Sequence, residues 1–455
     1  MSKTITAPVS GMRDFLPIEA LRRRYAVAIV EDVYQSYGFE PLETPVMERL
    51  ETLLGKYGEE GDRLIFRVMK RGRKLQRTLQ EAGGENDLAD AGLRYDLTVP
   101  LARVAAEYHG RLPRFLKRYQ IQQVYRADRP ARGRFREFYQ CDLDVTGSKS
   151  LLVEAEILSA AAAVLARLGF PAGDFQIRLN HRRVLSALLQ SAGVAPALEE
   201  TALVAIDKID KVGRSGVGRE LKERGVSERC AETLLRWMDE TPEEIESVME
   251  WLLSLFQSVP EAVSAVQDLR QIVTLCADGP VQGALKIDPY LARGLGYYTG
   301  AIFEVAFPDV PGSAGGGGRY DNLIGMFSGR EVPACGFSLG LERILILLEE
   351  RDLFPQNLAG RPELLVTLFD EAAMKHSLAL CRTLRGEGFR VDLYPENDSY
   401  GKQFKYAEQR SIRYALLLGP EELEREVVTV KDLQTGQQLA LRSGELAEEL
   451  RSRLR

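Results

Sequence analysis

The sequence has 455 residues, of which 45% are hydrophobic and 28% are charged, and its formal net charge is −6 at pH 7. These values are typical of a soluble protein with about two to four domains, and the absence of any run of about 18 apolar residues excludes a membrane-spanning chain. The N-terminus lacks the apolar core of a signal peptide and the five cysteines are scattered, so we expect a cytoplasmic chain with free thiols.

Helix and strand patterns alternate through the first 180 residues. Apolar residues at helical spacing predict a helix over residues 18–37 that ends at Gly38, and Pro41 and Pro45 then break an extended segment. The patterns further predict strands over 63–70, 93–98, 119–126 and 136–147 and helices over 99–110 and 151–169. A loop rich in arginine joins the last two strands.

The rest of the chain divides into further parts. Residues 181–278 have an almost wholly helical pattern, which predicts an inserted helical domain, and strand patterns return over residues 279–350. Residues 1–180 and 279–350 are therefore expected to form one core. Residues 351–361 are a predicted linker. Beyond it, residues 362–455 alternate strands with helices, which predicts a small, mostly parallel α/β domain.

Positive charge is concentrated in two runs, although the chain as a whole is acidic. Between Arg111 and Arg136 there are nine Lys or Arg residues against one acid, Asp128, and a second basic run extends from Arg63 to Arg77. Such runs are typical either of a solvated surface or of a contact with nucleic acid.

Four consecutive glycines, residues 315–318, precede Arg319 and Tyr320. This segment has neither the GK[ST] of a phosphate loop nor the GxGxxG of a dinucleotide site. It can form a flexible turn, or it can let a ligand approach the backbone closely. The neighbouring arginine and tyrosine favour the second interpretation.

Three arginines occupy unusual positions for surface residues. Arg126 ends a predicted strand, Arg293 lies in a mostly apolar stretch, and Arg343 lies in a helix with the pattern of a buried segment. A planar guanidinium binds phosphate through two hydrogen bonds, so all three are candidates to hold a nucleotide. For Arg343 the alternative is an ion pair with Glu342 or another acid.

Acids and small polar residues also gather on predicted strands. Asp96 and Thr98 lie close together, and Gln140, Asp142 and Asp144 share one strand face because residues two apart point the same way. Two carboxylates and an amide suit an ammonium or imidazole ligand, or Mg²⁺ with phosphates. A solvent-exposed sheet face is the alternative.

Several segments carry a resemblance to a known family. The segments YGFEPLETPVME (with Pro45), YRADRPARGRFREFYQCDLDVTG and GFSLGLERIL resemble motifs 1, 2 and 3 of the class II aminoacyl-tRNA synthetases. The segments LARGLGYYTGAIFEV and GGGGRYDNLIG, with GMRDFLP and LRYDLTVPLAR, are similar to signatures of the histidyl-tRNA synthetase family. The resemblance covers nearly the whole chain.

This resemblance implies an α+β fold, with a class II catalytic core on an antiparallel sheet, a helical insertion and a C-terminal α/β anticodon-binding domain. It also implies a homodimer that uses L-histidine, ATP and tRNA(His), without a membrane partner. The chemistry of ATP and the gathered acids further indicate Mg²⁺. In the implied reaction, the histidine carboxylate attacks the α-phosphorus of ATP and releases pyrophosphate. The terminal ribose hydroxyl of the tRNA then takes the histidyl group from the adenylate.

The motifs also imply roles for particular residues. The implied catalytic residues are Arg126, Arg293 and Arg343, and the implied ATP-binding residues are Arg126 at the α-phosphate, Arg134, and Arg343 at the γ-phosphate. The implied histidine-binding residues are Asp96, Thr98, Arg126, Gln140, Asp144, Arg293, Tyr298 and Tyr320. Among these, Asp144, Tyr298 and Tyr320 would recognise the imidazole, and no metal ligand is assigned.

One position departs from the family pattern, because Gly296 stands where the histidine signature has an aspartate. The closest alternative function is a non-catalytic paralogue that acts as an ATP phosphoribosyltransferase regulatory subunit. A threonyl or prolyl synthetase, or a synthetase-like RNA-binding or signalling protein, are further alternatives. The predicted C-terminal domain, the three arginines and the histidine signatures favour the catalytic interpretation.

Overall fold

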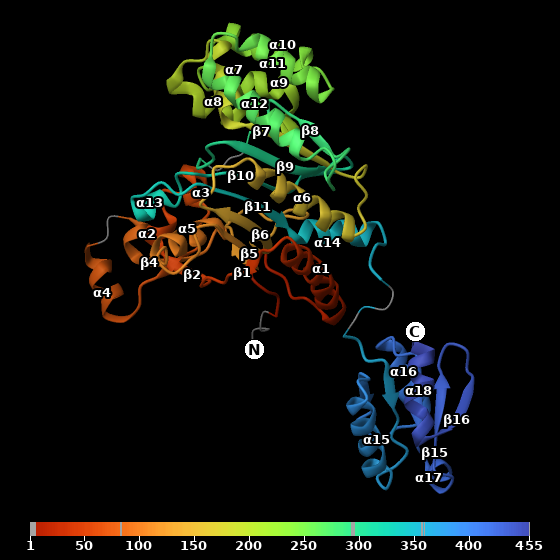
Figure 1. Cartoon of the computed structure of the whole chain (residues 1–455). Helices are drawn as coiled ribbons and strands as arrows, with labels where there is room; N and C mark the ends of the chain where they lie inside the picture. The colour runs from red at the N-terminus through yellow and green to blue at the C-terminus, as the bar shows by residue number, and fades with distance from the viewer. Residues whose placement is uncertain (1–5, 82–83, 293–295, 356–357, 359, 455) are drawn as a thin grey trace. The chain divides into compact units, whose positions relative to one another are not determined.

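The computed structural model describes residues 6–81, 84–292, 296–355, 358 and 360–454. The chain forms two compact units, Met1–Phe354 and Pro355–Arg455, whose elements are shown in Figure 1. Each unit has a hydrophobic core of its own. No described helix is long and apolar enough to cross a membrane.

An eight-stranded sheet is the centre of the first unit. Its strands are β1 (Glu40–Pro41), β5 (Leu116–Tyr125), β6 (Glu137–Thr146), β7 (Gln176–His181), β8 (Leu285–Ile287), β9 (Ala301–Phe307), β10 (Val310–Arg319) and β11 (Ala334–Gly340). They lie in the order β1-β5-β6-β11-β10-β9-β7-β8. All pairs are antiparallel except the two edge pairs, β1 with β5 and β7 with β8. This confirms the expected antiparallel core.

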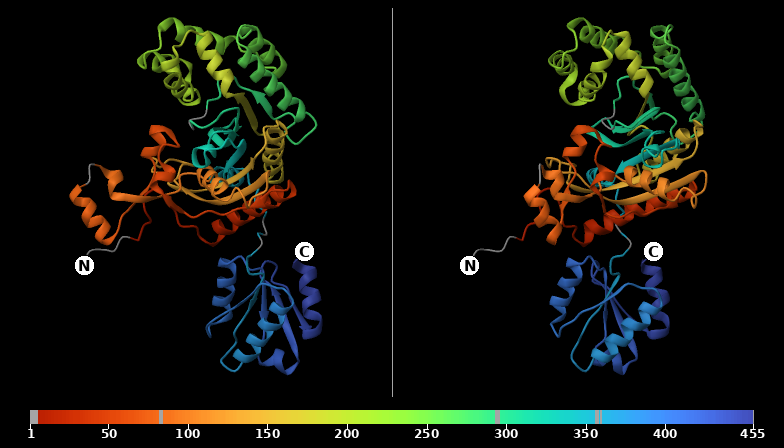
Figure 2. Two further views of the ribbon diagram at one scale, coloured as in Figure 1. Left: turned by 60° about the vertical axis from the view of Figure 1, so that its left-hand side comes forward. Right: turned by 90° about the vertical axis from the view of Figure 1, so that its left-hand side faces the viewer.

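Helices cover one face of this sheet. They are α1 (Pro17–Ser36), α6 (Leu152–Arg167) and α14 (Leu341–Glu350), which lie together against it in Figures 1 and 2. Cys141 and Leu143 of β6 are buried in the core under these helices. Because side chains alternate along a strand, Gln140, Asp142 and Asp144 point to the other face, as predicted.

A three-stranded sheet in the order β2-β4-β3 carries the remaining elements before β5. These are β2 (Met47–Arg49), α2 (Leu50–Leu53), α3 (Gly58–Arg63), β3 (Arg67–Met69), α4 (Gly72–Glu81), the 3₁₀ helix η1 (Glu85–Leu88), β4 (Ala89–Leu93) and α5 (Thr98–Glu107). The strand predicted over 93–98 is wrong, since the chain turns there into α5. The Oδ1 atom of Asp96 accepts a hydrogen bond from the Val99 amide at 3.1 Å, which stabilises the first turn of that helix.

The four glycines of residues 315–318 lie in β10, so they do not form a flexible turn. Neighbouring strands approach them closely: a Cβ atom on Gly317 would lie 2.0 Å from the Gly336 carbonyl oxygen, and one on Gly318 would lie 2.5 Å from the Ala301 carbonyl oxygen. Only glycine allows the strands to pair at these positions. The short helix α13 (Gly325–Ser328) follows β10.

The stretch between β7 and β8 is helical, as predicted. It contains α7 (Arg182–Ser191), the 3₁₀ helix η2 (Pro196–Leu198), α8 (Glu199–Ile206), α9 (Ile209–Glu223), α10 (Glu228–Glu240), α11 (Ile245–Leu255) and α12 (Pro260–Leu275). Figures 1 and 2 show these helices gathered beyond the edge of the large sheet that β7 and β8 form. Their buried apolar residues belong to the same core cluster as the large sheet.

The second unit contains a five-stranded sheet in the order β13-β12-β14-β15-β16. Its elements are β12 (Leu364–Val366), α15 (Met374–Gly386), β13 (Val391–Leu393), α16 (Tyr400–Gln409), β14 (Tyr414–Leu417), α17 (Pro420–Glu424), β15 (Val427–Asp432), β16 (Gln438–Arg442) and α18 (Ser443–Leu454). β12 pairs parallel with β13 and β14, whereas β14–β15 and β15–β16 are antiparallel. The prediction of a mostly parallel sheet is therefore only half right. The turn that joins β15 to β16 is too short for the crossover connection that parallel strands need.

Candidate active site

Cross-strand rows of the large sheet form the floor of the site. One row contains Arg118, Asp144, Gly336 and Gly318, and the next contains Gln120, Asp142, Ser338, Gly316 and Glu304, in each case as directly opposite partners. Small residues on β10 and β11 leave space above this floor. A Cβ atom on Gly336 would lie only 1.8 Å from Oδ1 of Asp144, so glycine is required beside that carboxylate.

Two adjoining cavities of about 470 and 400 Å³ open above this floor. The residues that line both are Arg126, Arg134, Gln140, Asp207, Glu304, Gly316 and Ser338. The shared lining makes the two cavities one continuous site. We call the larger one the arginine cavity and the smaller one the tyrosine cavity, after their characteristic side chains.

Asp144 in the tyrosine cavity has both an ion pair and a hydrogen bond with neighbouring side chains. Its Oδ2 atom lies 2.7 Å from Nη2 of Arg118, and its Oδ1 atom accepts a hydrogen bond from the Tyr320 hydroxyl. The Arg118 side chain is fully buried, and the Asp144 side chain is only 2% exposed. These two contacts fix the orientation of the Asp144 carboxylate.

Asp96 lies at the same cavity and is held by tyrosines. The Tyr57 hydroxyl donates a hydrogen bond to Oδ1 at 2.9 Å, and the Tyr297 hydroxyl donates one to Oδ2 at 3.4 Å. The rings of Tyr297 and Tyr298 pack edge to face with their centroids 5.0 Å apart, and Tyr297 packs similarly against Tyr320. The cavity is therefore lined by aromatic rings whose hydroxyl groups serve its acids.

The charge balance of the tyrosine cavity favours a positively charged ligand. Burial raises the pKa of Asp96, Asp142 and Asp144, and Arg118 only partly offsets this effect for Asp142 and Asp144. Asp96 and Asp144 line the cavity and Asp142 lies on the same strand face, and burial destabilises the ionised forms of all three carboxylates. An ammonium or imidazole N–H group in the cavity would relieve that cost.

The arginine cavity contains Arg126, Arg134 and Arg343. Nε of Arg126 donates to the Tyr95 carbonyl oxygen at 3.1 Å, and its guanidinium lies 4.3 Å from the Tyr95 ring centroid. Arg134 pairs with Asp128 at 2.8 Å, and Arg343 donates to the Ser313 carbonyl oxygen. These contacts aim three permanent positive charges into one space, as anion binding requires.

The carboxylate of Glu342 binds a backbone amide, and it does not form the ion pair with Arg343 that was one alternative from the sequence. Both of its carboxylate oxygens instead lie 3.0 Å from the Tyr139 amide nitrogen, which donates to them. These hydrogen bonds connect Glu342, in the first turn of α14, to the backbone of β6.

Comparison with known proteins adds the family. Residues 11–344 match the family model described as histidyl-tRNA synthetase, and residues 363–453 match the one described as anticodon binding domain. The chain belongs to the histidyl-tRNA synthetase family.

Curated relatives extend over nearly the full length. A histidine–tRNA ligase of Christiangramia forsetii is 40% identical, with 94% of this chain and 95% of the relative covered, and one of Gloeobacter violaceus is 41% identical with the same coverage. The crystal structure of a histidyl-tRNA synthetase from Nostoc sp. PCC 7120 is 30% identical, with a TM-score of 0.80 over 99% of this chain and 100% of that chain.

A further solved structure concerns the alternative function. The protein from Bacillus halodurans that is described as an ATP phosphoribosyltransferase regulatory subunit/histidyl-tRNA synthetase has a TM-score of 0.70. It covers 89% of this chain and 97% of its own length at 20% identity, a level that shows a common fold alone.

The structure brings the predicted site residues together. Nine of the ten line one or both cavities, namely Asp96, Thr98, Arg126, Arg134, Gln140, Asp144, Tyr298, Tyr320 and Arg343. Arg293 lies outside the described residues, so its place in the site stays a prediction. Gly296 is exposed, and a Cβ atom there would meet no atom within 4 Å.

Sequence reasoning missed several residues of the site. Arg118 and Ser338 face Asp144 and Asp142 across the sheet, but this depends on the register of β5, β6 and β11, which the strand patterns do not specify. Tyr57 directly precedes α3, where nothing in the sequence signals a hydroxyl for Asp96. Asp207 and Glu304 are acids that only the fold places at the cavities.

Glu342 allows a test of how a buried carboxylate affects the stability of the fold. Burial raises its pKa to about 7, against an ordinary value near 4.5. Between these two values the folded chain keeps a proton that the unfolded chain has lost, so the free energy of unfolding falls as pH rises through this window. In Glu342→Gln this fall is absent, and the variant should gain roughly 3 kcal/mol relative to the wild type between pH 4.5 and pH 8.

Urea unfolding at a series of pH values, followed by tryptophan fluorescence, measures this difference because Trp237 and Trp251 both lie in the first unit. Glu349→Gln, at an exposed position of the same helix, is the control and should show no such pH dependence. A wild-type-to-variant difference that stays constant over the whole pH range would contradict this account.

Proposed function

We propose that this chain ligates histidine to its tRNA by way of a histidyl-adenylate. In the first step the histidine carboxylate attacks the α-phosphorus of ATP, and pyrophosphate leaves. In the second step the terminal ribose hydroxyl of tRNA(His) attacks the adenylate carbonyl, and AMP leaves with the bonding electron pair. Full-length similarity to histidine–tRNA ligases supports this proposal.

One observation of the structure carries the proposal. A cavity lined by buried acids and tyrosine hydroxyls adjoins a cavity lined by arginines, and Arg126 and Gln140 line both. A ligand with an imidazole and an ammonium group suits the first cavity, and a polyphosphate suits the second. The two substrates would meet at Arg126, where the carboxylate must attack the α-phosphorus.

The proposed residue roles are those implied by the family motifs, and they are compatible with this arrangement. Asp144, Tyr320 and Tyr298 would recognise the two imidazole nitrogens, while Asp96, Thr98 and Gln140 would hold the ammonium and carboxylate groups. A pocket that satisfies both ring nitrogens can reject ligands without them by roughly 10⁴-fold, because its buried polar groups would otherwise stay unpaired.

Catalysis would come from charges that are already in place. Arg126, with Arg293 of the histidine signature, would stabilise the negative charge that develops on the α-phosphate, and Arg343 and Arg134 would hold the outer phosphates. A preorganised donor of this kind typically lowers the barrier by about 3–4 kcal/mol. Neither proton transfer nor a covalent enzyme intermediate is needed in the first step.

Mg²⁺ is proposed to accompany ATP. Among the described residues no group of three or more His, Cys, Asp or Glu side chains could hold a metal ion alone. Mg²⁺ in nucleotide sites is commonly held by one or two carboxylates together with phosphates and water. Glu304 and Asp207 line both cavities and would fit that pattern, and the ion would offset phosphate charge.

The chain is further proposed to act as a cytoplasmic homodimer. The side chains of Val46 and Met47, in the segment that resembles the dimer-forming motif 1, are exposed apolar groups, which supports a second copy at this face. All five cysteines are free thiols, which supports a reducing compartment.

For the domains we propose the division expected from the sequence. It consists of a catalytic core in two parts (1–180 and 279–350), a helical insertion (181–278), a linker (351–361) and an anticodon-binding domain (362–455). The boundary between the compact units, after Phe354, supports a linker in this place.

Amino-acid-dependent ATP–pyrophosphate exchange tests the first step. Histidine alone should support exchange, and Arg126→Ala should lower the rate by about 10²- to 10³-fold because charge on the α-phosphate loses a fixed partner. Arg167→Ala, on the exposed face of α6, is the matched control and should leave the rate unchanged. If none of the amino acids supports exchange, the proposed enzymatic activity is refuted and a regulatory paralogue is favoured. Exchange with threonine or proline would instead refute the proposed specificity for histidine.

Removal of the second unit tests whether that unit is needed for the tRNA-dependent step. A chain that ends at Phe354 keeps the core and both cavities, so exchange with histidine should stay within about threefold of the full-length rate. Aminoacylation of tRNA(His), measured on the same preparations, should fall by at least about tenfold because the anticodon-binding domain is lost. Undiminished aminoacylation by the truncated chain would contradict this role.

A further inference from the structure

Arg319 and Tyr320 are consecutive residues that lie on opposite sides of the large sheet. Arg319 is directly opposite Cys335, which in turn is opposite Val145, and both of these are buried in the core beneath α6. Tyr320 lines the tyrosine cavity and donates to Asp144. The arginine beside the four glycines therefore does not face a ligand, and its function must be sought behind the site.

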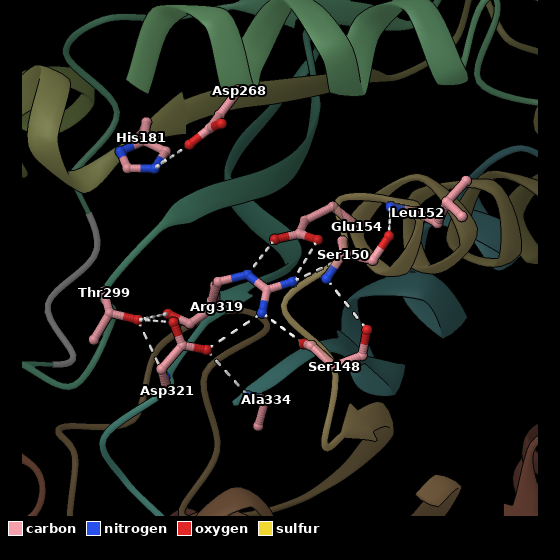
Figure 3. Close-up of polar contacts among 10 residues, drawn as sticks. All are labelled: Ser148, Ser150, Leu152, Glu154, His181, Asp268, Thr299, Arg319, Asp321 and Ala334. Atoms are coloured by element: carbon pink, nitrogen blue, oxygen red, sulfur yellow. Dashed lines mark hydrogen bonds and ion pairs between the residues drawn. The ribbon is translucent and has the colours of Figure 1, made fainter. Parts of the chain in front are cut away.

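There Arg319 makes a set of charge-assisted hydrogen bonds (Figure 3). Its Nε and Nη2 atoms donate to the two carboxylate oxygens of Glu154 on α6 at 2.6 and 2.7 Å. Nη1 and Nη2 also donate to the carbonyl oxygens of Ser148 and Ser150 at 2.9 and 3.3 Å. The side chains of Arg319 and Glu154 are 8% and 0% exposed, so this is a buried, bidentate ion pair.

A second acid extends these contacts to the histidine signature. Oδ1 of Asp321 lies 3.3 Å from Nη1 of Arg319 and accepts a hydrogen bond from the Ala334 amide at 3.2 Å. The Asp321 amide donates to Oγ1 of Thr299 at 3.1 Å, and the Thr299 amide donates to the Arg319 carbonyl oxygen at 2.8 Å. Figure 3 shows Thr299, Asp321 and Arg319 linked in this way.

The residues that make these contacts are direct chain neighbours of two tyrosines of the site. Tyr320 lies between Arg319 and Asp321, and Tyr298 directly precedes Thr299. Both tyrosines line the tyrosine cavity, yet neither Arg319 nor Thr299 lines it. The contacts therefore fix the backbone on both sides of Tyr320 and immediately after Tyr298.

We propose that Arg319, Glu154, Asp321 and Thr299, together the Arg319 network, are positioning residues that set the selectivity of the tyrosine cavity for histidine. The network holds Tyr298 and Tyr320 at the spacing needed by the two imidazole nitrogens. It acts through these tyrosines and touches neither histidine nor ATP. This inference rests on the proposed function and deepens it.

Arginine is the residue that this task requires. One planar guanidinium serves the two Glu154 oxygens, the carbonyl groups of Ser148 and Ser150, and Asp321 at the same time. A lysine ammonium keeps the charge but has only three donors and no fork geometry. Arg319→Lys should therefore fold with the ion pair to Glu154 retained, while losing the precise placement of the 319–321 segment.

Steady-state ATP–pyrophosphate exchange on the full-length chain tests the proposal. For Arg319→Lys we expect the KM for histidine to rise by about tenfold, since small displacements of recognition groups have large effects, and the KM for ATP to stay within about twofold. The matched control is Arg351→Lys, which alters another multidentate pair, with Asp174 and Asp309, and should change neither constant.

A milder pair of variants keeps the test decisive if Arg319→Lys does not fold. Thr299→Val removes the hydroxyl that accepts the Asp321 amide hydrogen bond without changing the shape, and should raise the KM for histidine by about threefold to fivefold. Thr299→Ser retains the hydroxyl and should behave as the wild type.

The outcomes separate the inference from the proposed function. Unchanged histidine KM values in folded Arg319→Lys and Thr299→Val, or equal increases for histidine and ATP, would overturn the positioning role while wild-type exchange leaves the proposed function intact. Failure of the wild type to exchange with histidine would instead refute the proposed function itself.

Discussion

The buried ion pair between Arg118 and Asp144 is the interaction on which the ligand side of the sheet depends. Two charges with almost no exposure are costly unless each has fixed partners. The register of β5 and β6 places them directly opposite each other, Gly336 provides the space beside the carboxylate, and the Tyr320 hydroxyl supplies a further hydrogen bond. Replacing Arg118 or Asp144 would leave the other charge buried without its partner, so the pair restricts the sequence of β5 and β6, together with Gly336 of β11 and Tyr320 directly after β10.

The alternation of side chains along the strands then gives the sheet two distinct faces. One face packs under α1, α6 and α14, and it contains the second buried ion pair, Arg319 with Glu154. The other face contains the acids, glycines and serine that form the floor of the cavities. Because Arg319 and Tyr320 are consecutive, the packing of the helix face is coupled directly to the geometry of the ligand face. With the proposed roles, the groups that recognise histidine are held from both sides of one sheet.

Much of this arrangement could be predicted from the sequence, but not its register. The period of two in β6 correctly placed Gln140, Asp142 and Asp144 on one face, and nine of the ten residues named from the motifs line the two cavities. Arg118 was missed because a strand pattern does not specify which residue lies opposite. The glycines were ambiguous because a flexible turn and a tightly paired strand have the same composition, and only the approach of Gly336 and Ala301 decides between them.

The most direct measurement is the affinity of Asp144→Asn for histidine, since the account assigns imidazole recognition to this carboxylate. The substitution keeps the shape but removes the charge that Arg118 and Tyr320 hold in place. Calorimetric titration should show histidine binding weakened by at least about 100-fold, with ATP binding within about twofold of the wild type as evidence of an intact fold. Histidine binding of unchanged affinity to Asp144→Asn would contradict the account.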